Sequence, residues 1–155
     1  MPTQPTIENL LDPRFTDLVL FEDVDQYSFF SRDIASVTAT TGGTFPAGAV
    51  IFRPKAITAS AAWDLVDAQA DIATTNDYGI VIGDDFELSE NVTYVTATPR
   101  NVIALVRRAR IKQAKFEAGL KATFAAASAT DIANLIRVLA TQGILVDGTL
   151  TAIPA

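Results

Sequence analysis

The chain has 155 residues, of which 49% are hydrophobic and 19% are charged, and this balance is typical of one globular domain with a buried core. It contains no histidine and no cysteine, which excludes disulfide bonds, thiolate metal ligands and the histidine-based pairs that activate most nucleophiles. No apolar run is long enough to span a membrane, and the first residues lack the basic and apolar parts of a signal peptide. We therefore expect a non-catalytic structural or binding protein without a membrane partner.

The net charge of −6 is divided unevenly along the chain. Fifteen acidic and four basic residues precede Arg100, whereas eight basic and three acidic residues are found from Arg100 onward. Such a division suits an acidic or nucleic-acid partner. It also suits copies of one protein that associate through surfaces of opposite charge.

Residues 1–40 are expected to form an extended N-terminal arm with short strands, and residues 41–155 a compact β-rich domain. Three prolines interrupt the start of the arm, and acidic turns separate its apolar runs. Because this much apolar surface is unfavourable in water, we expect the arm to dock on its own domain or on a partner. The docking side chains are expected to be Leu18, Val19, Leu20, Phe21, Phe29 and Phe30.

Glycine and proline residues divide the middle of the chain into short segments of β character. Three apolar segments bounded by such turns are expected to be strands, and the third alternates apolar and polar residues. Residues 60–75 are expected to be a long loop with one helical turn, because the helical spacing of apolar residues there is brief. The expected strands span 49–53, 78–82 and 91–98.

Residues 101–113 carry the strongest strand pattern in the chain. Both faces are apolar at first, and basic residues then occupy one face, so we expect a strand that is central at its start and solvated at its end.

A single short helix is expected near the C-terminus. Ser128 or Thr130 can cap it, Asp131 suits its positive end, and Gly143 can end it in a left-handed conformation. A last strand is expected at 144–146. The buried stripe of the helix consists of Ile132, Leu135, Ile136 and Leu139.

Three groups of residues invite a functional interpretation, and each has a simpler structural one. The acidic group around Asp84 and Asp85 matches no calcium-binding loop and follows a glycine, as turn residues do. The turn at 41–44 lacks the lysine and the following helix of a phosphate-binding loop. The basic stretch at 100–115 has one aromatic neighbour in an acidic protein, which favours a solvated strand face or a self-association surface over nucleic-acid binding. We expect no metal, no cofactor and no nucleic-acid partner.

The self-association surface is expected to pair basic side chains of one copy with acidic side chains of the next. Its members are expected to be Arg107, Arg108, Arg110, Lys112, Asp84 and Asp85.

Several short patterns follow one another in a characteristic order. After the arm come Gly43-x-x-x-x-Gly48-x-Val50-Ile51 and Tyr78-Gly79-Ile80-Val81. The strand Asn101-Val-Ile-Ala-Leu-Val-Arg107 with its basic continuation follows, and the short helix closes in Gly143-Ile144-Leu145-Val146. This order of features, over residues 18–146, resembles the head decoration, or capsid cement, proteins of tailed bacteriophages.

The resemblance implies an α+β, mostly β protein: a small sandwich or barrel-like domain with one short C-terminal helix and the extended arm. It implies a non-enzymatic role on the outer surface of the virion capsid after synthesis in the host cytoplasm. The partners would be the major capsid protein and two further copies of the chain in a homotrimer, with no small-molecule substrate. Neighbouring capsid subunits would be bridged and thereby stabilised.

Two other classes of function remain as alternatives. A phage tail or receptor-binding β module, such as one that binds sugars, would usually present aromatic side chains in a groove, and this chain offers Trp63 and three tyrosines. A carboxylate-dependent enzyme would need two carboxylates held at a fixed separation in a cleft.

Overall fold

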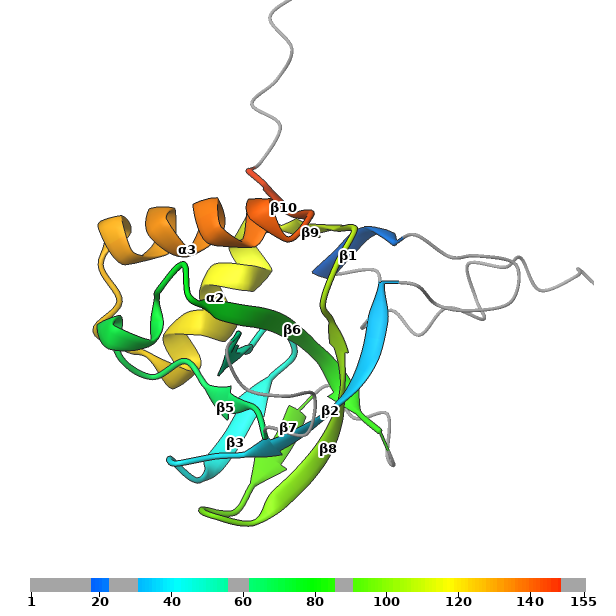
Figure 1. Cartoon of the computed structure of the whole chain (residues 1–155), viewed down its shortest axis with the longest axis vertical. Coiled ribbons are helices and arrows are strands. Elements are labelled where there is room, and N and C mark those ends of the chain that lie inside the picture. Colours follow the sequence, from blue (N-terminus) through cyan, green and yellow to red (C-terminus); the bar gives the residue numbers. More distant parts are fainter. Residues whose placement is uncertain (1–17, 23–30, 56–61, 86–90, 149–155) are drawn as a thin grey trace, which may run out of the picture.

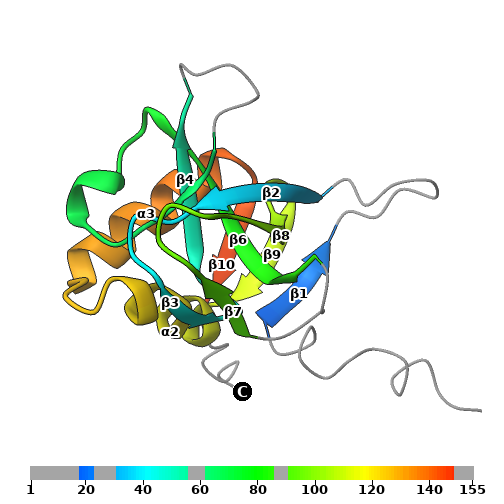
Figure 2. The same ribbon diagram turned by 90° about the horizontal axis from the view of Figure 1, so that it is seen from below.

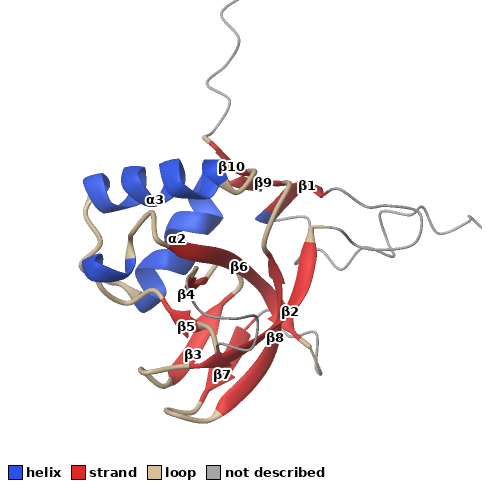
Figure 3. Cartoon of the chain, viewed as in Figure 1, coloured by secondary structure: helices blue, strands red, loops and turns tan. Residues whose placement is uncertain are grey.

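The computed structural model describes residues 18–22, 31–55, 62–85 and 91–148. The described part is mostly β, with two α-helices and one 3-10 turn, so the expected α+β, mostly β class is confirmed (Figure 3). Its elements are β1 (Val19–Glu22), β2 (Arg32–Thr38), β3 (Gly43–Pro46), β4 (Val50–Pro54), β5 (Asp64–Leu65), η2 (Gln69–Asp71), β6 (Asn76–Asp84), β7 (Asn91–Tyr94), β8 (Pro99–Leu105), β9 (Ala109–Lys112), α2 (Gln113–Thr123), α3 (Ala129–Thr141) and β10 (Ile144–Asp147).

Five strands form a curled antiparallel sheet in the order β2-β8-β6-β4-β5. A single parallel bridge between Val37 and Trp63, the residue before β5, joins the two ends of this sheet. The Trp63 N–H donates to the carbonyl of Ser36 at 2.9 Å, and the Thr38 N–H donates to the carbonyl of Trp63 at 2.8 Å. These bonds close the sheet on itself as a small barrel, so neither β2 nor β5 is a free edge along this contact. Figure 2 shows β2, β8, β6 and β4 of this sheet from below.

Strand alternation gives the barrel wall two apolar faces, as expected for strands with cores on both sides. On β4, Ile51 points into the barrel, whereas Val50 and Phe52 pack against the core shared with the helices. The inner core is small and includes Trp63, and the outer core contains the buried residues of α2, α3, β9 and β10. Figure 1 shows both helices on one side of the barrel.

A two-stranded sheet of β3 and β7 lies at the end of the molecule opposite α3 (Figure 1). Its Tyr94 is buried within the inner core, and the Phe45 ring packs against it with centroids 6.0 Å apart. These two rings therefore help to fill one end of the barrel.

The segment predicted to be one strand at 101–113 is instead two strands and the start of a helix. The chain turns after Leu105, and Arg108 has a φ of 44°, a conformation that strands do not use. Ser31, which is fully buried, holds the turn: its carbonyl accepts from the Val106 N–H at 2.9 Å, and its hydroxyl donates to the Arg108 carbonyl at 2.8 Å. The prediction was wrong because the apolar alternation resumes beyond the turn in β9.

The prediction of a single helix was also wrong, because α2 precedes α3. Only three residues of α2 are buried, Phe116, Gly119 and Leu120, so the segment carries little of the periodic apolar stripe that identifies a helix. Its fit depends on a close approach between backbones: a Cβ at Gly119 would overlap the backbone of Gly48. Gly48 in turn has a φ of 99°, which favours glycine.

The C-terminal helix is confirmed as α3. The Ser128 hydroxyl accepts from the Asp131 N–H at 3.1 Å, and the Asp131 carboxylate accepts from the Ser128 N–H at 2.9 Å. The Ser128 hydroxyl also donates to the Asp131 carboxylate at 2.7 Å, and this bond, followed by that from the Ser128 N–H, lowers the pKa of Asp131. Gly143 follows the helix with a φ of 81°, and β10 begins at the next residue.

The boundary expected at residue 40 does not match the fold. β1 pairs with β9, and β2 forms a full strand of the barrel against β8, so residues 18–22 and 31–40 are built into the domain. The other strands expected in the middle of the chain appear as β4, β6 and β7, but β7 ends at Tyr94 and not at residue 98, because the chain turns there and Ala97 has a φ of 59°. The expected loop at 60–75 contains β5 and η2.

We predict that Gly119→Ala destabilises the protein by about 2 kcal/mol or more, because the added methyl group forces two backbones apart. Alanine is normally the better helix former, so this sign opposes helix propensity. Urea unfolding followed by Trp63 fluorescence measures the change. The exposed neighbour Ala118→Gly is the control and should cost about 1 kcal/mol. A stabilised Gly119→Ala variant would show that the backbones are not in close contact.

Candidate interaction surfaces

The described residues contain no group of three or more acidic side chains placed to hold a metal ion. None of the helices in the described ranges combines the length and apolar character needed to cross a membrane. Two surface features stand out instead: an apolar sheet face on β1, β9 and β10, and a polar pocket at the mouth of the barrel.

The sheet face arises because β9 leaves the barrel after the Arg108 turn and pairs with β1 on one side and β10 on the other. Leu20 and Leu145 are 49% and 47% exposed, and Arg110 lies on the strand between theirs, in register with Leu145. We call Leu20, Arg110 and Leu145 the leucine face. Large aliphatic side chains at this exposure on neighbouring strands are candidates for contact with another protein.

The residues expected to dock on a capsid are divided by the structure. Leu18 is only 2% exposed and belongs to the outer core, where Val19 packs against it, so these two side chains stabilise the domain itself. Of the expected docking residues whose side chains the structure describes, only Leu20 is exposed. The side chain of Phe21 is not described, and Phe29 and Phe30 lie outside the described residues.

The basic residues expected to bind other copies lie near acids of the same chain. The guanidinium group of Arg110 is 2.6 Å from the Asp147 carboxylate, and that of Arg107 is 3.8 Å from the Asp33 carboxylate. Arg108 is exposed at the turn before β9, and Lys112 is half-buried at the end of β9. Because partly exposed pairs of this kind are weak, they leave these side chains able to exchange partners but supply little energy.

Asp84 does not lie on an exposed self-association surface, contrary to expectation. Its side chain is only 2% exposed and forms an ion pair with Arg100, whose Nε donates to the carboxylate at 2.7 Å. Burial is the reason for this pairing, since an isolated carboxylate inside the domain would be costly. Asp85 is exposed at the end of β6.

Tyr94 lies near this ion pair. Its hydroxyl group is buried and has no hydrogen-bond partner in the described structure. Burial, followed by the nearby Asp84 carboxylate, raises the pKa of Tyr94 above its ordinary range, so the phenol is neutral at physiological pH.

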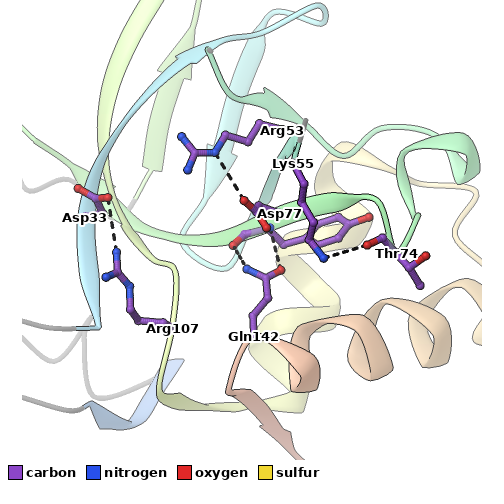
Figure 4. Close-up of polar contacts among 8 residues, drawn as sticks. Asp33, Arg53, Lys55, Thr74, Asp77, Arg107 and Gln142 are labelled. Atoms are coloured by element: carbon purple, nitrogen blue, oxygen red, sulfur yellow. Dashed lines mark hydrogen bonds and ion pairs between the residues drawn. The ribbon is translucent and has the colours of Figure 1, made fainter. Parts of the chain in front are cut away.

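The mouth of the barrel is a polar pocket of about 270 Å³ lined by strands that are distant in sequence. Arg53 on β4 faces Asp77 on β6, with Nε 4.0 Å from the carboxylate, and the Asp33–Arg107 pair lines the same pocket (Figure 4). The guanidinium carbon of Arg53 lies 4.5 Å from the centre of the Trp63 ring. The pocket is thus lined by charged side chains and by Trp63, whose ring lies under the Arg53 guanidinium group.

Gln142, just after α3, fixes one side of this mouth. Its side-chain oxygen accepts from the Tyr78 N–H at 2.9 Å, and its side-chain nitrogen donates to the Tyr78 carbonyl at 3.1 Å (Figure 4). The side-chain amide therefore hydrogen-bonds to the N–H and the carbonyl of Tyr78, at a point of β6 that precedes its pairing with β8, which begins at Ile80. It anchors the end of the helix to the barrel.

Sequence reasoning did not identify the mouth. Asp33, Arg53 and Asp77 are separated by about twenty residues each, and only the pairing of β2, β4, β6 and β8 brings them together. The alternation within each strand could have predicted that these side chains share a face with the barrel interior, since each polar residue lies two positions from a residue that faces inward.

Comparison with known proteins adds no relative. No protein-family model, no curated protein and no solved structure matches the chain significantly.

We predict that Arg100→Gln destabilises the protein by roughly 2 kcal/mol, because it leaves the Asp84 carboxylate buried without a counter-charge. This expected loss in the free energy of unfolding is smaller than for a fully buried ion pair because Arg100 is 40% exposed. Urea unfolding at neutral pH measures the loss.

The control for this variant is Arg110→Gln, which breaks the more exposed pair with Asp147 and should cost less than about 1 kcal/mol. The double variant Asp84→Asn/Arg100→Gln should recover part of the stability, since no buried charge remains. Equal costs for the two single variants would contradict the assignment of Asp84 as a buried ion-pair partner.

Proposed function

We propose that this protein is a non-enzymatic decoration protein that binds the outer surface of an icosahedral phage head and bridges neighbouring major capsid subunits. The observation that carries the proposal is the leucine face, where two half-exposed leucines flank an arginine on a three-stranded sheet. A surface of this kind fits association with another protein better than contact with water.

The position of the leucine face also favours the proposal. β1 and β10 are the outer strands of their sheet, so each has backbone groups on its far side that no described strand pairs. A partner strand added there would continue the sheet while its side chains cover the leucines. Leu18 and Val19 anchor β1 in the core, which gives the sheet a fixed base for such a contact.

The order of sequence features that resembles head decoration proteins supports the same role from a separate direction. The homotrimer implied by that resemblance is part of the proposal. Each copy would contribute a modest contact energy, and the many copies on one particle would together favour the assembled shell by mass action.

The test is co-sedimentation of the purified protein with capsids of the phage that encodes it. We expect binding to expanded capsids and not to immature ones. Leu20→Ser/Leu145→Ser should weaken binding by about a hundredfold or more, because two leucines lose their apolar contact area.

The matched control is Val95→Ser, which alters an exposed aliphatic residue, 63% accessible, in the turn after β7 at the other end of the molecule. It should bind as the unaltered protein does. Failure of the unaltered protein to bind expanded capsids would overturn the proposed function. Unchanged binding by the double leucine variant would instead remove the leucine face from it.

A further inference from the structure

The mouth of the barrel has a composition that barrel closure alone does not require. Inside the barrel the lining is apolar, with Ala35, Ile51 and Ala104 among its buried residues. One step further along the same strand faces, the lining becomes Asp33, Arg53 and Asp77. Arg53 and Asp77 are direct cross-strand partners, so the fold itself sets their spacing.

Within each ion pair of the mouth, the two charged groups are close but not in direct hydrogen-bond contact with each other. Arg107 and Asp33 approach to 3.8 Å, and Arg53 and Asp77 to 4.0 Å, whereas a charge-assisted hydrogen bond has a length of about 2.8 Å. An oxygen atom placed about 2.8 Å from both members of such a pair fits this spacing. A hydroxyl group at that point can accept from the guanidinium and donate to the carboxylate at once.

The charge balance of the mouth selects among possible ligands. Two arginines and two aspartates give no net charge, so an anion gains from the arginines but is repelled by the aspartates, and a cation meets the reverse. A neutral molecule with several hydroxyl groups meets neither penalty. Such a molecule can also hydrogen-bond to both the arginine and the aspartate of each pair, whereas an anion or a cation is attracted to only one of them.

The apolar lining and the size of the mouth complete the selection. Trp63 is 7% exposed and the Arg53 guanidinium lies over its ring, so Val106 and the small accessible part of Trp63 supply the apolar surface of the pocket. The volume of about 270 Å³ lies just below the range of roughly 300–1,000 Å³ typical of sites for drug-sized ligands. The space therefore suits one small ring and not an extended chain.

We propose that the barrel mouth binds a single neutral sugar ring, whose hydroxyl groups bridge Arg53 to Asp77 and Arg107 to Asp33 while its C–H surface contacts the apolar atoms of Trp63 and Val106 that line the pocket. Gln142 has a positioning role, since its amide holds β6 and so keeps Asp77 in place opposite Arg53. This site shares no residue with the leucine face and does not rest on capsid binding.

Trp63 provides the measurement, because it is the sole tryptophan of the chain and lines the site. The full chain is titrated with the methyl glycosides of glucose, galactose, mannose and N-acetylglucosamine while tryptophan fluorescence is recorded. We expect a saturable change with at least one of them, at the millimolar concentrations typical of single sugar rings. Sodium phosphate and sodium acetate, matched in ionic strength to sodium chloride, form the anion arm and should give no saturable change.

Asp33→Asn and Asp77→Asn each remove an acceptor charge and keep the shape of the side chain. Each should weaken the response by about tenfold to a hundredfold, since a hydrogen bond to a charged group is lost. Arg110→Gln alters an ion pair elsewhere and should bind sugar unchanged. Because Asp33 is 60% exposed, its variant should keep the fold, which the thermal unfolding midpoint checks.

Three results would overturn the proposal. The first is the absence of a saturable change with every glycoside, and the second is saturation by phosphate or acetate. The third is a sugar response that Asp33→Asn and Asp77→Asn leave intact. None of these results bears on co-sedimentation with capsids.

Discussion

The bridge between Val37 and Trp63 is the contact on which the rest of the structure depends. Two backbone hydrogen bonds at one residue turn a five-stranded sheet into a barrel, and the Asp64 carboxylate beside it accepts from both the N–H and the hydroxyl of Thr40. Closure removes two sheet edges and encloses a core that an open sheet would leave in water. It also places Trp63 among the charged residues of the mouth, so the same contact contributes to the lining of the proposed sugar site.

The second constraint is the turn at Arg108. If β8 ran on as a straight strand, β9 would extend past the barrel with one basic face in solvent. Because buried Ser31 holds the turn, β9 departs to pair with β1 and β10, and its buried face joins the core under the two helices. The leucine face is the outer side of that second sheet. Barrel closure and the Arg108 turn thus produce the two surfaces to which we assign function.

Local patterns predicted much of the secondary structure and little of the surface. Apolar runs bounded by turn residues located β4, β6 and β7, and the Ser128 cap with its apolar stripe located α3, because those signals lie within one element. The helix α2 was not predicted because its packing relies on Gly119 against Gly48, a contact between backbones that leaves no apolar stripe in the sequence. The Arg108 turn was not predicted because Ser31, the residue that stabilises it, is 77 positions away in the sequence. Charge counting likewise could not show that Asp84 is buried beside Arg100.

The described fold, and with it the proposed sugar site, requires that the barrel is closed in solution, and amide hydrogen exchange at Trp63 and Thr38 tests this most directly. If the bridge persists, both amides should exchange as slowly as that of Val81, whose N–H donates to the Ala49 carbonyl inside the sheet. Exchange at the rate of unbonded surface amides would show an open sheet. In that case Trp63 would not line the mouth of the barrel, and the closed barrel described for the fold would be contradicted.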